Sequence, residues 1–75
     1  MQNISVFSEY LTALAGYSSK VDSGNVTDNE FIEFQKLEAR ITNAYKVGYY
    51  KEPEYRALIQ IYQYLKDGFR IVLGL

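Results

Sequence analysis

Glutamates are the residues of this chain whose type and spacing come nearest to catalytic chemistry, because it has neither histidine nor cysteine. Glu30, Glu33 and Glu38 fall on one segment that the sequence predicts to be helical. Acid–base and nucleophilic catalysis both need a second group that positions or activates the first. A helix cap explains Glu30, a solvated face explains Glu33, and Glu38 stands without a partner at the edge of an apolar stripe. The sequence therefore predicts a protein that is not an enzyme and has no catalytic residues.

Residues 22–33, "DSGNVTDNEFIE", have the length of a calcium-binding EF-hand loop and acidic residues at both ends. Glycine stands at the third position of this segment instead of the sixth, and valine occupies the fifth, where an oxygen ligand is required. Without cysteine there is no thiolate site, and no glycine-rich phosphate loop follows a strand. We therefore expect no metal, no cofactor and no small-molecule substrate.

Length and composition favour one small helical domain over residues 1–75, of which 48% are hydrophobic and eight are tyrosine. A chain of this size lies near the lower limit for an independent core. The formal net charge of −1 provides no strong field for nucleic acid or an anionic membrane. Ala13-Leu14-Ala15 has the pattern of a signal cleavage site, but no basic residue precedes it, so we interpret it as helix interior. We expect a cytoplasmic protein that does not enter a membrane.

Apolar residues recur with the period of a helix in three segments of the chain. This pattern predicts an all-α fold, a small three-helix bundle. The predicted helices cover about residues 5–19, 27–47 and 53–67. Ser5 is a plausible N-cap, and Thr27 with Glu30 forms a capping box at the second start. Gly48 can end the second helix in a left-handed turn, and Pro53 suits the first turn of the third.

The end of the third helix is open to two interpretations, because Gly68 interrupts it. Gly68 could end the helix and leave residues 69–75 as a strand or tail. Alternatively the helix continues to residue 73, at a cost of about 1 kcal/mol for glycine relative to alanine. Phe69 and Val72 keep the helical phase of the residues before them, which favours continuation.

The third helix carries about twice the apolar surface that a bundle helix needs. One apolar row comprises Tyr55, Leu58, Tyr62, Leu65, Phe69 and Val72, and a second comprises Ala57, Ile61 and Tyr64. A helix in a simple bundle needs one stripe a little over 100° wide. Either this helix lies between the other two and buries both flanks, or one flank meets another chain. We favour the second explanation, because each of the other helices shows a single apolar face of ordinary width.

The sequence thus predicts an interaction module that acts by contact with another protein, with itself as a homodimer through the third helix, or with both. The residues expected at the interface are Tyr49, Tyr50, Tyr55, Ile61, Tyr62, Tyr64, Leu65 and Phe69. Tyr55, Leu58 and Leu65 are expected in the core under either explanation. The expected roles are a regulator or inhibitor of the kind that phages and mobile elements encode, or a structural homo-oligomer.

A nucleic-acid-associated regulator is a further alternative, with Arg56, Lys66 and Arg70 as the candidate contacts. The stretches "SEYLTAL" at residues 8–14 and "TDNEFIEF" at residues 27–34 resemble the Hha/YmoA family, small helical proteins that modulate the nucleoid protein H-NS. The interval between the two stretches is too short for that family's second helix. We therefore do not assign the chain to this family, and three dispersed cations do not favour nucleic acid as the partner.

Overall fold

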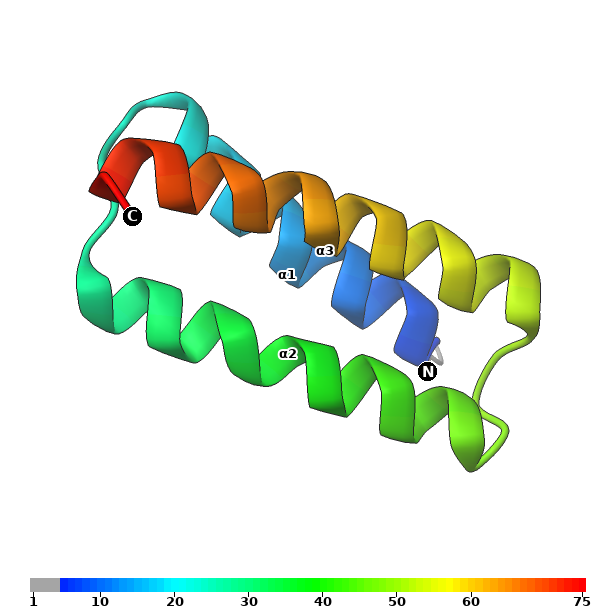
Figure 1. Cartoon of the computed structure of the whole chain (residues 1–75). Coiled ribbons are helices and arrows are strands. Elements are labelled where there is room, and N and C mark those ends of the chain that lie inside the picture. Colours follow the sequence, from blue (N-terminus) through cyan, green and yellow to red (C-terminus); the bar gives the residue numbers. More distant parts are fainter. Residues whose placement is uncertain (1–4) are drawn as a thin grey trace.

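The computed structural model describes residues 5–75, which fold into three helices joined by short loops, each helix antiparallel to the one before it (Figure 1). Helix α1 is Val6–Asp22, α2 is Asp28–Lys46 and α3 is Glu52–Leu73. The fold class predicted from the sequence, a small all-α three-helix bundle, is confirmed.

Each helix begins where local hydrogen bonds satisfy its free amides. The Ser5 hydroxyl accepts from the Ser8 amide at 3.1 Å at the start of α1. Thr27 and Glu30 form the complete capping box that the sequence predicts for α2. At α3 the Lys51 amide donates to the Glu54 carboxylate at 3.2 Å, and Pro53 occupies the first turn. Since lysine has no acceptor, only this half of a capping box exists there.

Each helix also ends on a glycine with positive φ, at Gly24, Gly48 and Gly74. At all three ends the glycine amide donates to the carbonyl three residues earlier, and the next amide donates five residues back. This is the Schellman pattern, in which a left-handed residue satisfies the last carbonyls of a helix. Gly48 therefore plays the predicted role.

Two helix ends differ in extent from the sequence-based expectation. The first helix was expected to fade near residue 19, but it continues to Asp22 because Gly24 provides the left-handed stop. The third helix runs through Gly68 to Leu73, so the extended tail is excluded and the continuous helix is confirmed.

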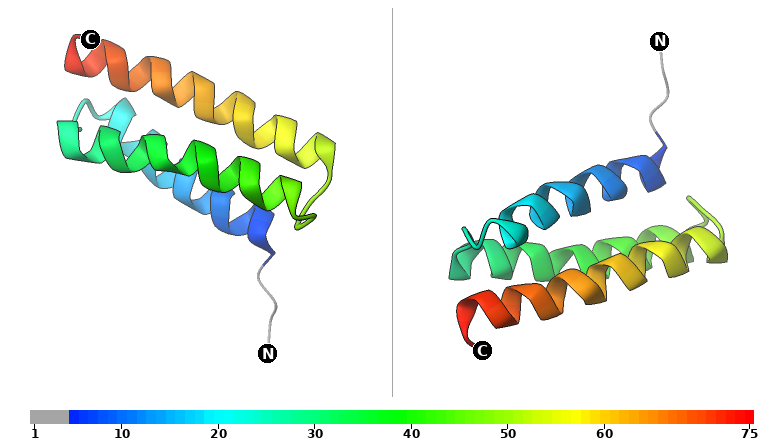
Figure 2. Two further views of the ribbon diagram at one scale, coloured as in Figure 1. Left: turned by 60° about the horizontal axis from the view of Figure 1, so that its bottom comes forward. Right: turned by 90° about the horizontal axis from the view of Figure 1, so that it is seen from above.

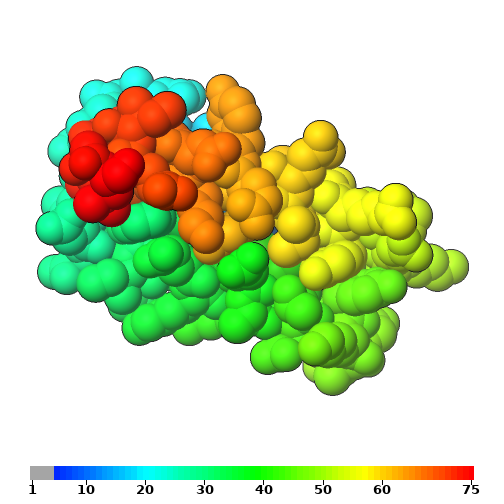
Figure 3. Space-filling view, viewed as in Figure 1, coloured from blue at the N-terminus to red at the C-terminus, as the bar shows by residue number. Residues whose placement is uncertain are grey.

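Helix α3 packs along both α1 and α2, whereas α1 and α2 have few contacts with each other. The views in Figure 2 show the three helices from two further sides. On the face shown in Figure 3, side chains of α2 and α3 fill the space that lies between their ribbons in Figure 1. Helix α3 thus lies between the other two, but this position does not bury both of its flanks, because Ile61 and Tyr64 are exposed.

The core is centred on the ring of Phe34, at which all three helices meet. This ring stacks on Tyr62 of α3 with centroids 4.6 Å apart and planes 6° apart, and it lies 4.7 Å from the ring of Phe69. Tyr17 of α1 meets Phe34 edge-on at 5.3 Å. Offset and edge-on contacts of this kind add to the hydrophobic stabilisation of the buried rings.

Candidate interaction surface

Four of the eight predicted interface residues lie in the core of the protein. Tyr50, Tyr62, Leu65 and Phe69 are all buried, and the last three face α1 and α2 from one side of α3. The Tyr50 hydroxyl donates to the Ile41 carbonyl, and burial raises the pKa of Tyr50 to about 12. Burial also raises the pKa of Tyr62. These side chains are occupied within one molecule, so they are not available to a partner in this fold.

Tyr55 is half-buried and also has partners within the molecule. Its ring stacks on that of Tyr45 with centroids 4.4 Å apart and planes 9° apart. Its hydroxyl lies 3.4 Å from the Thr42 hydroxyl oxygen. Leu58, which the sequence also placed in the core, is fully buried.

The remaining three predicted residues are exposed, but they do not all lie together. Tyr49 stands in the loop between α2 and α3. Ile61 and Tyr64 lie on α3, where 37% and 76% of their respective surfaces are accessible. The second apolar row that the sequence identified on this helix is therefore exposed, while most of the first row is buried.

Exposed apolar residues extend this second row to the end of the chain and form a surface that we call the α3 ridge. The ridge consists of Ile61, Tyr64, Ile71, Val72 and Leu75. Its four helical members fall within an arc of about 100° at 100° per residue. Ile71 and Leu75 are 79% and 67% exposed and border a shallow hollow together with Asp67 and Arg70.

Sequence reasoning missed the second half of this ridge. Val72 was assigned to the inner row, and Ile71 and Leu75 were not counted as interface residues. The signal that could have found them is the helical phase, because Ile71 lies seven residues after Tyr64 and so falls near it on the same side.

Gly68 separates the two halves of the ridge, at a point where Val21 of α1 packs against α3. A Cβ atom added to Gly68 would lie 2.6 Å from Cγ1 of Val21. Real Cβ atoms do not approach other atoms so closely, so an alanine here would push Val21 and α1 away. This explains why α3 contains a glycine that its helical backbone does not need.

The basic residues proposed as nucleic-acid contacts do not form one patch. Arg56 is in an ion pair with Glu52, whose carboxylate lies 2.6 Å from its guanidinium. Arg70 follows fourteen residues later, which corresponds to about 21 Å along the helix axis. Lys66 is half-buried and lies on a different side of the helix from Arg56.

A groove lies between α1 and α2, which have few contacts with each other. It has a volume of about 360 Å³ and is lined by Ala13, Gly16, Tyr17, Lys20, Asn29, Glu30 and Glu33. We call it the α1–α2 groove. Its lining surface is mainly apolar, and small residues of α1 provide part of it.

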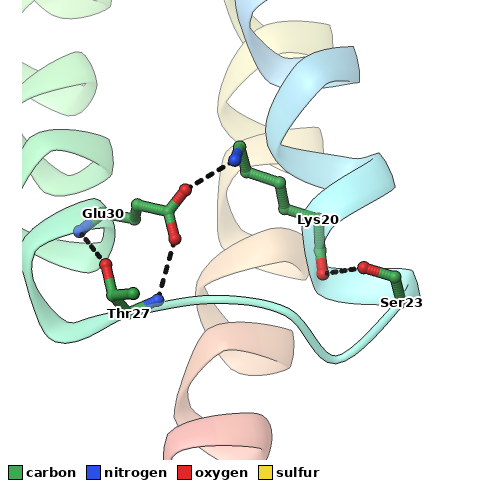
Figure 4. A network of polar contacts seen from close by, with 4 residues as sticks. All are labelled: Lys20, Ser23, Thr27 and Glu30. Carbon is green, nitrogen blue, oxygen red and sulfur yellow. Dashed lines mark hydrogen bonds and ion pairs between the residues drawn. The ribbon is translucent and has the colours of Figure 1, made fainter.

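On the charged side of this groove, Glu30 contacts both Lys20 near the end of α1 and Thr27 at the start of α2 (Figure 4). One of its carboxylate oxygens accepts from Lys20 at 2.7 Å, and the other accepts from the Thr27 amide at 2.9 Å. These hydrogen bonds, first that of Lys20, lower the pKa of Glu30, while the same contact raises the pKa of Lys20. Their contribution to stability is present above the ordinary pKa of glutamate and is lost as the pH falls through the lowered value.

Residues 5–75 contain no group of three or more side chains that could hold a metal ion together. Over the same residues, no helix combines the length and the hydrophobicity that crossing a membrane requires. No protein-family model, curated protein sequence or solved structure matches this chain.

Proposed function

We propose that this protein is a non-enzymatic interaction module, which regulates or inhibits a larger protein by docking the α3 ridge on it. The observation that supports this proposal is the ridge itself. Four large apolar side chains follow one side of α3, Leu75 follows the helix end, and none of the five belongs to the buried core. Groups of exposed large apolar side chains are typical of protein contact sites.

The chemistry of the ridge indicates what its partner must offer. Tyr64 is the largest and most polar-tipped member, and residues of this type contribute strongly at the centres of interfaces. Asp67 and Arg70 lie beside the ridge and are exposed. A complementary partner therefore presents an apolar pocket for Tyr64 and Ile61, with charged groups of both signs at its edge.

The test is capture of partner proteins from the native host with three forms of the chain. These forms are the wild type, Tyr64→Glu, and Gln63→Glu as the matched control. Gln63 is also exposed on α3 but lies off the ridge. The specific partner should bind the wild type and the control alike. Tyr64→Glu should weaken its dissociation constant at least about tenfold, as expected for loss of a central aromatic contact. A partner that binds Tyr64→Glu as tightly as the wild type would contradict the proposal.

A further inference from the structure

Asp67 and Arg70 are two exposed charged side chains of α3 that form no ion pair within residues 5–75. They stand three residues apart, which is about 4.5 Å along the helix axis. Together with Ile71 and Leu75 they border the hollow near the end of the chain. One small patch thus carries an acid, a base and two exposed aliphatic side chains.

This patch faces away from the rest of the molecule. Asp67 lies nearly opposite, around the helix, to the centre of the side that α3 turns to the core. The buried residues on that inner side are Leu58, Tyr62, Leu65 and Phe69. A helix of a second molecule can therefore lie along the patch without meeting α1 or α2 of the first.

The charges of the patch are complementary to themselves. A contact between two identical copies around a two-fold axis brings the same patch of each copy together. The patch has one acid and one base and no net charge, as such a contact requires. When two α3 helices run antiparallel across an axis midway between residues 67 and 70, each Asp67 lies opposite the Arg70 of the other copy. The contact then contains two identical ion pairs.

The same register also matches the shapes of the two surfaces. Tyr64 lies three residues before Asp67, so it faces a level three residues after Arg70 of the other copy. That level is midway between Ile71 and Leu75, where the hollow has a volume of about 370 Å³. Tyr64 is exposed and projects from its own helix. One register thus pairs the charges and also places the largest side chain of the ridge over the hollow.

We propose that two copies of this protein associate through α3 in this antiparallel register. Asp67 of each copy pairs with Arg70 of the other, and Tyr64 of each copy enters the other's hollow. This proposal rests on the proposed function, because it uses the same ridge. Since the dimer covers Tyr64, Ile71 and Leu75, self-association excludes docking on a larger protein. The concentration of the chain therefore regulates access to the ridge.

The test exchanges the charges and measures solution mass by light scattering over a range of concentrations. The wild type should reach the mass of two chains and stop there, because a two-fold contact leaves no free copy of the patch. Asp67→Arg makes the patch basic and Arg70→Asp makes it acidic. Each variant alone should associate at least about tenfold more weakly, because like charges then face each other.

Arg40→Asp is the matched control, because Arg40 is exposed on α2 and this variant has the same net charge as Arg70→Asp. It should form dimers like the wild type. All the substituted positions are exposed, so every variant should keep the helical circular dichroism of the wild type.

Two combinations of the variants should restore the dimer. An equimolar mixture of Asp67→Arg and Arg70→Asp should form mixed dimers, because each basic patch then meets an acidic one. A chain that carries both substitutions should associate with itself, because the reversed charges still pair. A single variant that associates like the wild type, or a mixture that stays monomeric, would show that the proposed pairing is wrong.

A wild type that stays monomeric at every concentration, or that grows beyond two chains, would also overturn the proposal. Neither result would touch the docking of the ridge on a larger protein, which partner capture with Tyr64→Glu tests separately. Conversely, failure of that capture would leave the mass measurements intact, because they contain no second protein.

Discussion

The two flanks of α3 have similar composition but opposite surroundings, and Tyr62 and Tyr64 show the difference most clearly. Tyr62 is 1% exposed and stacks on Phe34, whereas Tyr64, two residues later, is 76% exposed. Two positions along a helix correspond to a rotation of about 200°. The same contrast occurs in the loop before α3, where Tyr49 is exposed and the adjacent Tyr50 is buried. Residue type therefore does not determine burial in this chain, and the position relative to α1 and α2 does.

The largest expected effect comes from truncating the buried flank. Leu65→Ala should destabilise the fold by about 2–5 kcal/mol, because it leaves a cavity where Leu65 packs against the core. Ile71→Ala is the matched control on the exposed flank and should change stability by less than about 0.5 kcal/mol. Urea denaturation at a concentration where the protein is monomeric measures both. Equal effects of the two variants would show that the flanks are not distinct.

The next largest effect on stability is expected at Gly68, which lies between the two halves of the ridge. Gly68→Ala should not give the stabilisation of about 1 kcal/mol that helix propensity predicts. The added Cβ would lie 2.6 Å from Val21, and such overpacking costs about 1–3 kcal/mol. In a Val21→Ala background the same substitution should stabilise the protein, as a double-mutant cycle in thermal or urea denaturation would measure.

Gly16→Ala is the control for this cycle, because its added methyl group meets nothing. It should stabilise the monomer by about 1 kcal/mol whether residue 21 is valine or alanine. If Gly68→Ala behaves like Gly16→Ala in the wild-type background, the close approach of α1 and α3 is not as described.

A smaller effect is expected at Tyr50, which contrasts with its exposed neighbour Tyr49. Tyr50→Phe removes the hydrogen bond to the Ile41 carbonyl and should cost about 1 kcal/mol near neutral pH. Since burial raises the pKa of Tyr50 to about 12, its contribution is complete below the unfolded pKa of about 10 and is lost as the pH rises through 12.

Between pH 9 and 12 the free energy of unfolding, measured by urea denaturation, should therefore fall more for the wild type than for Tyr50→Phe. A titration of tyrosine absorbance should show one group near pH 12 that is missing from the variant. Tyr49→Phe should keep both the loss of stability at high pH and the group near pH 12, and an identical response of the two variants would contradict the burial of Tyr50.

The smallest effect on stability is expected for Tyr64→Glu. Because Tyr64 is exposed, this variant should remain folded and differ from the wild type by less than about 0.5 kcal/mol in urea. Tyr62→Glu places a charge beside Phe34 and should unfold the chain. Unfolding by Tyr64→Glu would place that flank in the core as well.

Much of the fold could be predicted because it is encoded locally. The capping box at Thr27 and the glycine stop at Gly48 lie within a few residues of the ends they set. The same kind of stop at Gly24 was overlooked, since the residues before it resemble a loop, and α1 was expected to be too short. Helix periodicity also separated the two rows of α3 correctly, with Val72 as the exception.

The burial of those rows could not be predicted from the sequence. Which row faces inwards depends on where α1 and α2 lie, and this is a property of packing between distant segments. Tyr50 shows the same limit, because the geometry of one loop decides that it reaches Ile41 while Tyr49 does not. Helical phase places Ile71 on the same side as Tyr64, but that this side is exposed follows only from the positions of α1 and α2.

The position of α3 also affects how the molecule is made. Helix α3, which contacts both other helices, is synthesised after them, and α1 and α2 have few contacts with each other. A nascent chain that ends before residue 52 lacks the rings of Tyr62 and Phe69, which pack on Phe34 in the folded protein. The core can therefore be completed only after α3 has been synthesised and has packed on both α1 and α2.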